Sequence, residues 1–196
     1  MKKKFLILTI IVVFMMGLVL LRDQMAKSVV EGVTSRIVGA PVHIKTFKFS
    51  LMKSTIGITG FQIDNPTGFP KDILVSISMI KVTYDRAALF KGKLHILMAE
   101  IELKEYGLIR NKEGLLNVDS LRIVKQQRNK LKNSPPLPIK IDLLTLGIGK
   151  IVHKDYSRGG EPVVEVRDMH IYRSYKNITS AEQLVALIMA EPMRAA

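Results

Sequence analysis

The hydrophobic pattern of the chain begins with one long uncharged run. Residues 5–21 carry no charged side chain, and the lysines Lys2–Lys4 precede them. As a helix this run is about 25 Å long. That is short for a hydrocarbon core of about 30 Å, but Lys4 and Arg22 can reach the interface at either end. The lysine cluster favours a cytoplasmic N-terminus, so we predict a single transmembrane anchor over residues 1–22.

The same run also fits a cleaved signal peptide, which would have a shorter apolar region followed closely by small residues at a cleavage site. The sequence RDQMAKSVV after Leu21 offers no good site, so the anchor is favoured. From Ala26 to Ile37 apolar positions recur at helical spacing, and Gly39 provides a stop. Residues 23–39 are therefore predicted to form an amphipathic stalk helix, with a simple spacer as the alternative.

From Val42 onward the period of the apolar positions changes from 3.6 to 2, which predicts β-strands joined by short turns. The alternating runs form a first β region, 40–120, and a second, 138–178. Within most runs the apolar parity flips from odd to even positions or back. The flips lie between Ile44 and Phe47, at Gly60 and at Met79–Ile80.

A parity flip moves the apolar side chains to the other face of a sheet, unless a bulge or bend resets the strand. Bends repeated in neighbouring strands give a sheet that folds over, with a continuous apolar concave surface. A sandwich whose strands cross between two sheets also contains bends, and the pattern alone leaves both open. The predicted fold class is mainly β with α (α+β): a bent antiparallel sheet of eight or nine strands with one or two accessory helices.

Two further segments have helical character. Asp119 is a good N-cap for residues 121–137, which are strongly basic and end in a proline-rich linker. This segment fits either a helix at an anionic surface or, as we favour, a solvated connector. Ser180 and Gln183 have capping-box spacing, which predicts a C-terminal helix over residues 179–192.

Charge narrows the partners that this chain can have. The formal net charge is +13, of which Lys2–Lys4 supply three, leaving +10 on the remainder. Such a surface favours anionic partners such as phospholipid head groups. Aromatic residues make up only 6% of the chain and Trp is absent, which weakens a single-strand nucleic-acid interface because such interfaces use stacking platforms. We therefore expect membrane lipids, and no nucleic acid, as partners.

The sequence offers no recognisable catalytic or metal-binding motif. Cysteine is absent, and no two histidines have the helical spacing of a zinc site. His153 and Asp155 share one face of a predicted strand, but two ligands do not make a metal site. The segment GIGK at Gly147–Lys150 lacks the spacing of a phosphate-binding loop. We expect no enzymatic activity, no metal and no cofactor.

Three stretches in order carry a family resemblance. They are VHIKTFKFSLMKSTIGITGFQIDNPTGFP, ISMIKVTYDRAALFKGKLHILMAEIEL and LIRNKEGLLNVDSL. Together they resemble the N-terminal region of AsmA-like bacterial envelope proteins. The resemblance rests most on two turns, Gly60–Phe69 with its Asn-Pro step and Arg110–Asn117 with its Arg-Asn start.

The resemblance implies a bent β-groove, an inner-membrane anchor with a cytoplasmic N-terminus, and a periplasmic domain. It also implies a role in moving or organising lipids between bacterial membranes. Known members are far longer, whereas eight or nine strands at about 4.8 Å spacing would span only about 40 Å. A chain this short would act as a module, self-associate, or join an envelope protein partner through a sheet edge.

Two hypotheses follow: the chain binds lipid in an apolar β-groove, or it is a structural or assembly factor that docks a partner protein and holds no lipid. The candidate groove residues are apolar positions of the first β region, and they serve equally well as a closed core. They are Phe47, Phe49, Ile56, Ile58, Phe61, Ile63, Ile77, Ile80, Val82, Ile96 and Ile101.

Overall fold

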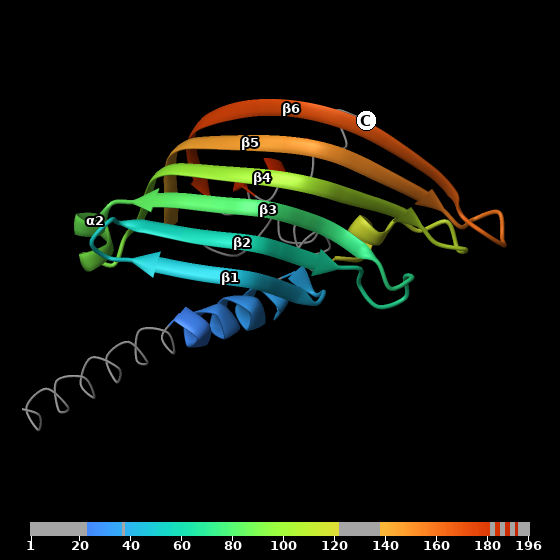
Figure 1. Ribbon diagram of the computed structural model, residues 1–196, viewed down its shortest axis with the longest axis horizontal. Coiled ribbons are helices and arrows are strands. Elements are labelled where there is room, and N and C mark those ends of the chain that lie inside the picture. Colours follow the sequence, from blue (N-terminus) through green and yellow to red (C-terminus); the bar gives the residue numbers. More distant parts are fainter. Residues whose placement is uncertain are drawn as a thin grey trace, which may run out of the picture.

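The computed structural model describes residues 23–36, 38–121, 138–180 and positions 183, 184, 187, 188 and 191. Its centre is one six-stranded sheet whose strands lie in chain order (Figure 1). The strands are β1 (Val42–Ser50), β2 (Thr55–Asp64), β3 (Ile73–Tyr84), β4 (Leu94–Arg110), β5 (Pro138–Asp155) and β6 (Val163–Ser180). Two short helices, α2 (Arg86–Phe90) and the 3-10 helix η1 (Asn117–Ser120), lie in the connections.

The predicted mainly β character is confirmed, but the expected antiparallel sheet of eight or nine strands is wrong. In the described ranges there are six strands, and β4 and β5 pair in parallel while every other pair is antiparallel. Strand number was overestimated because β4, β5 and β6 are 17 to 18 residues long, and each bend splits one strand into two alternating runs. The parallel pair is allowed by the long connection between Arg110 and Pro138, since parallel strands need a crossover.

A row of residues leaves the hydrogen-bonded ladder in all six strands, and we call it the first crease. Its members lie opposite or close to one another across the sheet, and the register shifts at this row between β3 and β4 and between β5 and β6. The members are Lys45, Gly60, Ser78, Lys104 and Gly149, with Met169 and His170 together in β6. Gly60 and His170 have φ values of 61° and 48°, in the left-handed region that interrupts the alternation of an extended strand.

The first crease keeps the apolar side chains on one face. Ile44 and Phe47 lie on opposite sides of the crease, yet both contact the same hydrophobic core, as do Ile77 and Ile80. The flips predicted near Ile44 and at Gly60 are therefore resets that preserve the apolar face. In β3 the reset falls at Ser78, so Met79 is turned outward and is 38% exposed.

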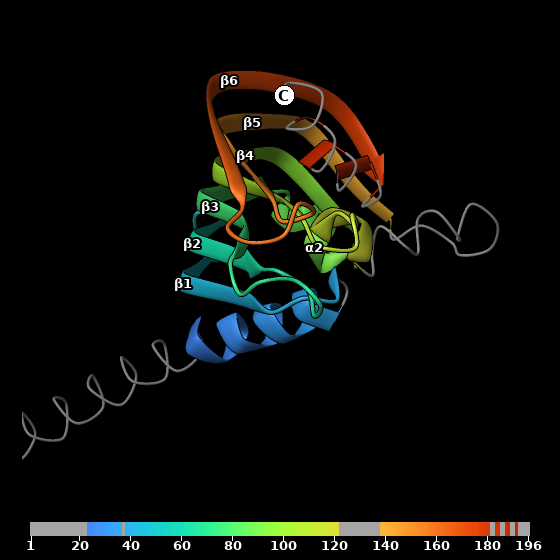
Figure 2. The ribbon, with the colours of Figure 1, turned by 90° about the vertical axis from the view of Figure 1, so that its right-hand side faces the viewer.

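A second crease crosses only β4, β5 and β6. Leu97, Asp142 and Asn177 drop out of the ladder there, and Asn177 has a φ of 56°. Residues that drop out of a strand increase its twist and bend it. Figure 2 shows the result, with β4, β5 and β6 arching over while the first three strands are straighter.

The helical residues 23–36 lie along β1. The carboxylate of Glu31 accepts a hydrogen bond from the backbone N–H of Ile44 at 2.6 Å, so the helix satisfies one donor on this open strand edge. Val30 packs against the core, while Val29 and Val33 of the predicted stripe are 63% and 51% exposed. Within the described ranges no helix is long and apolar enough to span a membrane. The predicted anchor and the basic segment 122–137 lie outside those ranges.

The first crease predicts an unequal response of two glycines in β2. A Cβ at Gly60 would meet the Cβ of Lys45 at 2.8 Å, and the φ of Gly60 is positive, whereas a Cβ at Gly57 would meet nothing within 4 Å. We expect Gly60→Ala to lower the free energy of unfolding by about 1–3 kcal/mol. Gly57→Ala should be neutral or stabilise by less than about 1 kcal/mol. Thermal unfolding of both variants measures the difference, and equal melting temperatures would contradict a strained crease.

Candidate functional site

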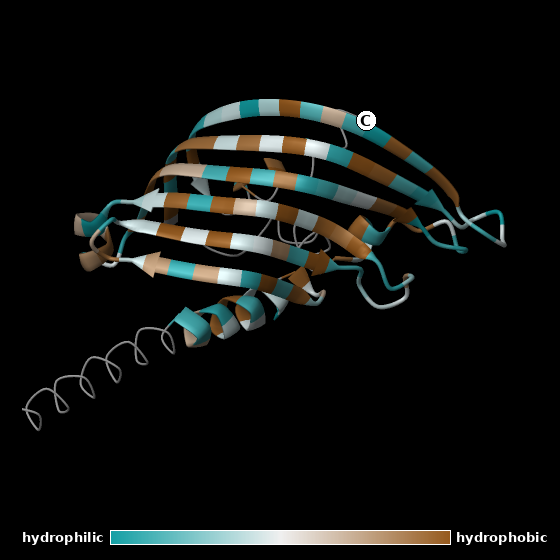
Figure 3. Ribbon diagram, viewed as in Figure 1, coloured by the Kyte–Doolittle hydropathy of each residue, from teal (hydrophilic) through white to brown (hydrophobic). Residues whose placement is uncertain are grey.

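The two faces of the sheet differ in chemistry, and Figure 3 shows the alternation of apolar and polar positions along the strands that produces this. On the outer face, ion pairs join neighbouring strands. Lys81 lies 3.7 Å from Glu100, and Lys150 lies 2.9 Å from Glu105. The inner face is apolar, so it must be covered or remain open to an apolar ligand.

Part of the inner face is covered by other segments of the chain. Val118 and Leu121 pack on it from η1 and the residue after it, and Val38 from the end of the N-terminal helix. Leu184 and Leu187 of the C-terminal segment also pack there, and Figure 2 shows that segment beneath the arch. This segment is held by capping, since Ser180 Oγ accepts from the N–H of Gln183 at 3.1 Å and Gln183 Oε1 from the N–H of Thr179 at 2.9 Å.

Covering is uneven both along and across the strands, and it divides the candidate groove residues into two groups. Five of them are between 4% and 9% exposed and belong to the closed core: Phe61, Ile63, Ile77, Ile96 and Ile101. Six are half-buried, and we call them the apolar patch: Phe47, Phe49, Ile56, Ile58, Ile80 and Val82. The sequence predicted a common face for all of these residues, but it gave no sign of which part of that face would be covered.

The apolar patch is built from two rows of paired residues. One row pairs Phe49 with Ile56 and Ile56 with Val82 across three strands. The other row pairs Phe47 with Ile58 and Ile58 with Ile80. The ring of Phe49 also stacks on that of Tyr84, with centroids 5.8 Å apart. No polar side chain interrupts either row, so the apolar patch is a continuous surface at the end of the sheet that carries α2.

Next to the apolar patch lies a small cluster of titratable groups. His95 Nε2 is 2.8 Å from Asp142 Oδ2, and His95 Nδ1 is 3.4 Å from Asp85 Oδ2. A hydrogen bond from Lys140, and then the ring of His95, hold the pKa of Asp142 below its usual range. The N–H groups of Ala88 and Ala87, which Asp85 caps at the start of α2, lower the pKa of Asp85.

Both carboxylates are ionised and paired with other groups, so a structural role fits this cluster better than proton transfer. We call Asp85, His95 and Asp142 the His95 clasp. Among the described residues no group of three or more potential ligands could hold a metal ion. Asp155 accepts from the N–H of Ser157 at 2.8 Å, and with His153 it completes no ligand set. In the described part of the chain, the feature that suits a ligand is the apolar patch, and its chemistry suits an apolar one.

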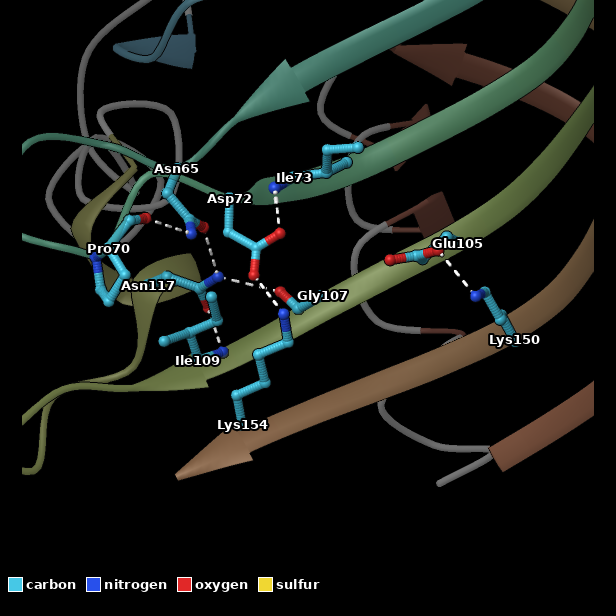
Figure 4. Close-up of polar contacts among 10 residues, drawn as sticks. All are labelled: Asn65, Pro70, Asp72, Ile73, Glu105, Gly107, Ile109, Asn117, Lys150 and Lys154. Atoms are coloured by element: carbon cyan, nitrogen blue, oxygen red, sulfur yellow. Dashed lines mark hydrogen bonds and ion pairs between the residues drawn. The ribbon is translucent and has the colours of Figure 1, made fainter. Parts of the chain in front are cut away.

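The two turns that carry the family resemblance meet in the structure (Figure 4). Asn117 is fully buried and its amide donates to Asn65 Oδ1 at 2.8 Å and to the carbonyl of Gly107 at 2.9 Å. Its own Oδ1 accepts from the N–H groups of Ile109 and Val118. All four hydrogen-bonding positions of this amide are therefore used. The side chain of Asn117 thus hydrogen-bonds to the backbone of β4, close to where β3 begins.

Asn65 completes the joint from the other side. Its side chain donates to the carbonyl of Pro70 at 2.9 Å, and its N–H donates to the carbonyl of Asp72 at 2.9 Å. Asp72 is also ion-paired with Lys154 of β5. Gly68, inside this turn, has a φ of 95°, a value that glycine adopts readily. The sequence identified both turns. The contact between them joins residues that are 52 positions apart, so it could not be deduced from either turn alone.

Comparison with protein-family models, with curated proteins and with solved structures found no match. The AsmA-like resemblance therefore stays a prediction from the motifs, and the functional argument rests on the geometry of the sheet.

The joint between the two turns predicts a large and coupled loss of stability. Asn117→Ala would leave buried groups of Ile109, Val118 and Gly107 without a partner. Since each such group costs about 1–3 kcal/mol, we expect a loss of about 3 kcal/mol or more. A double-mutant cycle with Asn65→Ala, followed by denaturant unfolding, should give a coupling energy of about 0.5–3 kcal/mol. Additive effects would show that the two side chains act independently.

Proposed function

We propose that this chain is a membrane-anchored lipid-binding module of the bacterial envelope, which holds acyl chains on the apolar patch. In this proposal the N-terminal anchor sits in the inner membrane with its N-terminus in the cytoplasm, and the β domain is periplasmic. The module contributes to lipid transport or to the organisation of the outer envelope, as the AsmA-like resemblance implies. It is proposed to act without catalysis or a cofactor.

One observation carries the proposal: a continuous apolar patch remains only half-buried on the inner face of a bent sheet, although the rest of that face is covered. Leaving six large apolar side chains partly in water is unfavourable, at about 25 cal/mol for each Å² that stays exposed. An apolar ligand recovers this free energy, because each methylene group moved out of water contributes about 0.8 kcal/mol. The two unbroken rows give a linear chain a surface without polar obstacles.

The proposal predicts a difference between two adjacent residues of β3. Ile80 belongs to the apolar patch, whereas Met79 points to the outer face and is 38% exposed. With a photo-crosslinking amino acid at either position of the full chain in native membranes, we expect phospholipid adducts from position 80 and few from position 79. Mass spectrometry of the adducts identifies the lipid.

Two outcomes would contradict the proposal. Protein adducts at position 80 without lipid would favour a surface that docks a partner. Equal lipid labelling at positions 79 and 80 would mean that both probes only report contact with the bilayer.

The second candidate is an assembly factor, and β6 is the feature that favours it. This 18-residue strand lies at the margin of the sheet, and the exposed fractions of Val164, Val166 and Tyr172 are 51%, 56% and 68%. Such a margin can accept a strand from a second copy or another protein. In the same crosslinking series, protein adducts from Val164 with no lipid adducts from Ile80 would select this candidate.

A further inference from the structure

A second apolar surface lies at the end of the sheet, beyond the apolar patch. It combines the β1–β2 turn with α2 and the residues that follow, and we call it the tip. Its apolar members are Leu51, Met52, Leu89, Phe90 and Leu94, which are 42%, 91%, 38%, 79% and 46% exposed. Its basic members are Lys53, Arg86, Lys91 and Lys93, all exposed.

The two parts of the tip are held together. The guanidinium of Arg86 donates to the carbonyl of Leu51 at 3.4 Å, and the hydroxyl of Tyr84 donates to the carbonyl of Ser50 at 3.2 Å. Figure 1 shows α2 beside the β1–β2 turn at this end of the sheet. Met52 and Phe90 therefore project from one connected surface.

The charge of the tip is one-sided. Asp85 is its single acidic residue, and that carboxylate already accepts hydrogen bonds from Ala87 and Ala88 and lies beside His95. The nearby Asp142 is paired with Lys140 at 2.8 Å. Exposed apolar side chains ringed by basic residues are the composition of segments that lie in the interface of an anionic bilayer.

We infer that the tip docks onto an anionic phospholipid bilayer, with Met52 and Phe90 inserted at the level of the head groups and the four basic side chains on lipid phosphates. Each basic residue near such a surface strengthens binding about fivefold. The helical residues 23–36 run antiparallel to β1, so the chain enters the domain from the side where the tip lies (Figure 1). The tip therefore faces the membrane that the predicted anchor would occupy.

Docking in this orientation links the bilayer to the apolar patch. Phe49 lies at the end of β1 next to the tip and is paired with Ile56. An acyl chain that leaves the bilayer at the tip meets Phe49 and Ile56 first, and then Ile58 and Ile80. The inference thus deepens the proposed function by naming the route of lipid entry, and it rests on that function for the identity of the cargo.

The full chain contains no cysteine, so single labels test the inference directly. Met52→Cys and Phe90→Cys are labelled with an environment-sensitive fluorophore, and Val166→Cys, 56% exposed on β6, is the matched control. Each protein is reconstituted into nanodiscs of phosphatidylcholine alone or with phosphatidylglycerol. We expect brominated lipid to quench the labels at 52 and 90 strongly in anionic discs and less in neutral ones, and the label at 166 in neither.

Charge reversal separates docking from general adsorption. Lys91→Glu with Lys93→Glu should abolish quenching of the label at 90, whereas Lys71→Glu with Lys112→Glu, exposed lysines at the opposite end of the sheet, should not. Labels at 52 and 90 that stay as water-exposed as the label at 166 would overturn the inference, as would an unchanged signal after reversal at 91 and 93. If lipid crosslinks form at Ile80 while the labels at 52 and 90 stay in water, docking through the tip is refuted but the proposed function stands.

Discussion

The structure depends on a reset of strand alternation that is aligned across every strand. A long strand that bends would turn its apolar side chains from one face to the other. Here one residue of each strand, and two in β6, leave the ladder along a single row, so all six strands reset together. Apolar residues on both sides of the row consequently share one hydrophobic core. The sheet can therefore bend while its apolar side chains all stay on the same face.

The second constraint is the buried joint at the other end of the sheet from α2. Asn117 and Asn65 link the connections that follow β4 and β2, and the ion pair of Asp72 with Lys154 extends the link to β5. One end of the sheet is thus tied by fully satisfied hydrogen bonds and packed by η1. The opposite end carries the apolar patch, the His95 clasp and the tip. This division separates an end closed by buried hydrogen bonds from an end whose apolar patch is only half-buried.

The sequence predicts the alternation, the resets and the turn chemistry, because each of these depends on neighbouring residues. Gly60 is an example, since the flip in the neighbouring apolar positions was enough to place a reset there. Pairing between distant segments could not be predicted, so the parallel β4–β5 pair was missed. The sequence placed the reset of β3 at Met79–Ile80, whereas the structure places it at Ser78, which turns Met79 outward. The resets at His170 and Asn177 lack a glycine, although both residue types tolerate positive φ better than most.

The tip was missed because its residues lie in turns, where alternation gives no signal. The juxtaposition of Met52 with Lys53, and of Phe90 with Lys91, was the available sign. Likewise, burial rather than hydropathy separates the apolar patch from the core. Ile80 of the apolar patch and Ile77 of the core are the same residue type in the same strand. Which end of an apolar face is covered depends on where the remaining segments pack, and that is a property of the whole fold.

The central claim is that the half-buried apolar patch on the inner face holds lipid. Native mass spectrometry of the full chain, released gently from detergent, tests it most directly. The account predicts bound phospholipid on the wild-type chain and on a Met79→Gln control, and its loss from an Ile58→Gln, Ile80→Gln variant that remains folded. A wild-type chain that carries no lipid, or a folded patch variant that carries as much lipid as the control, would contradict the account.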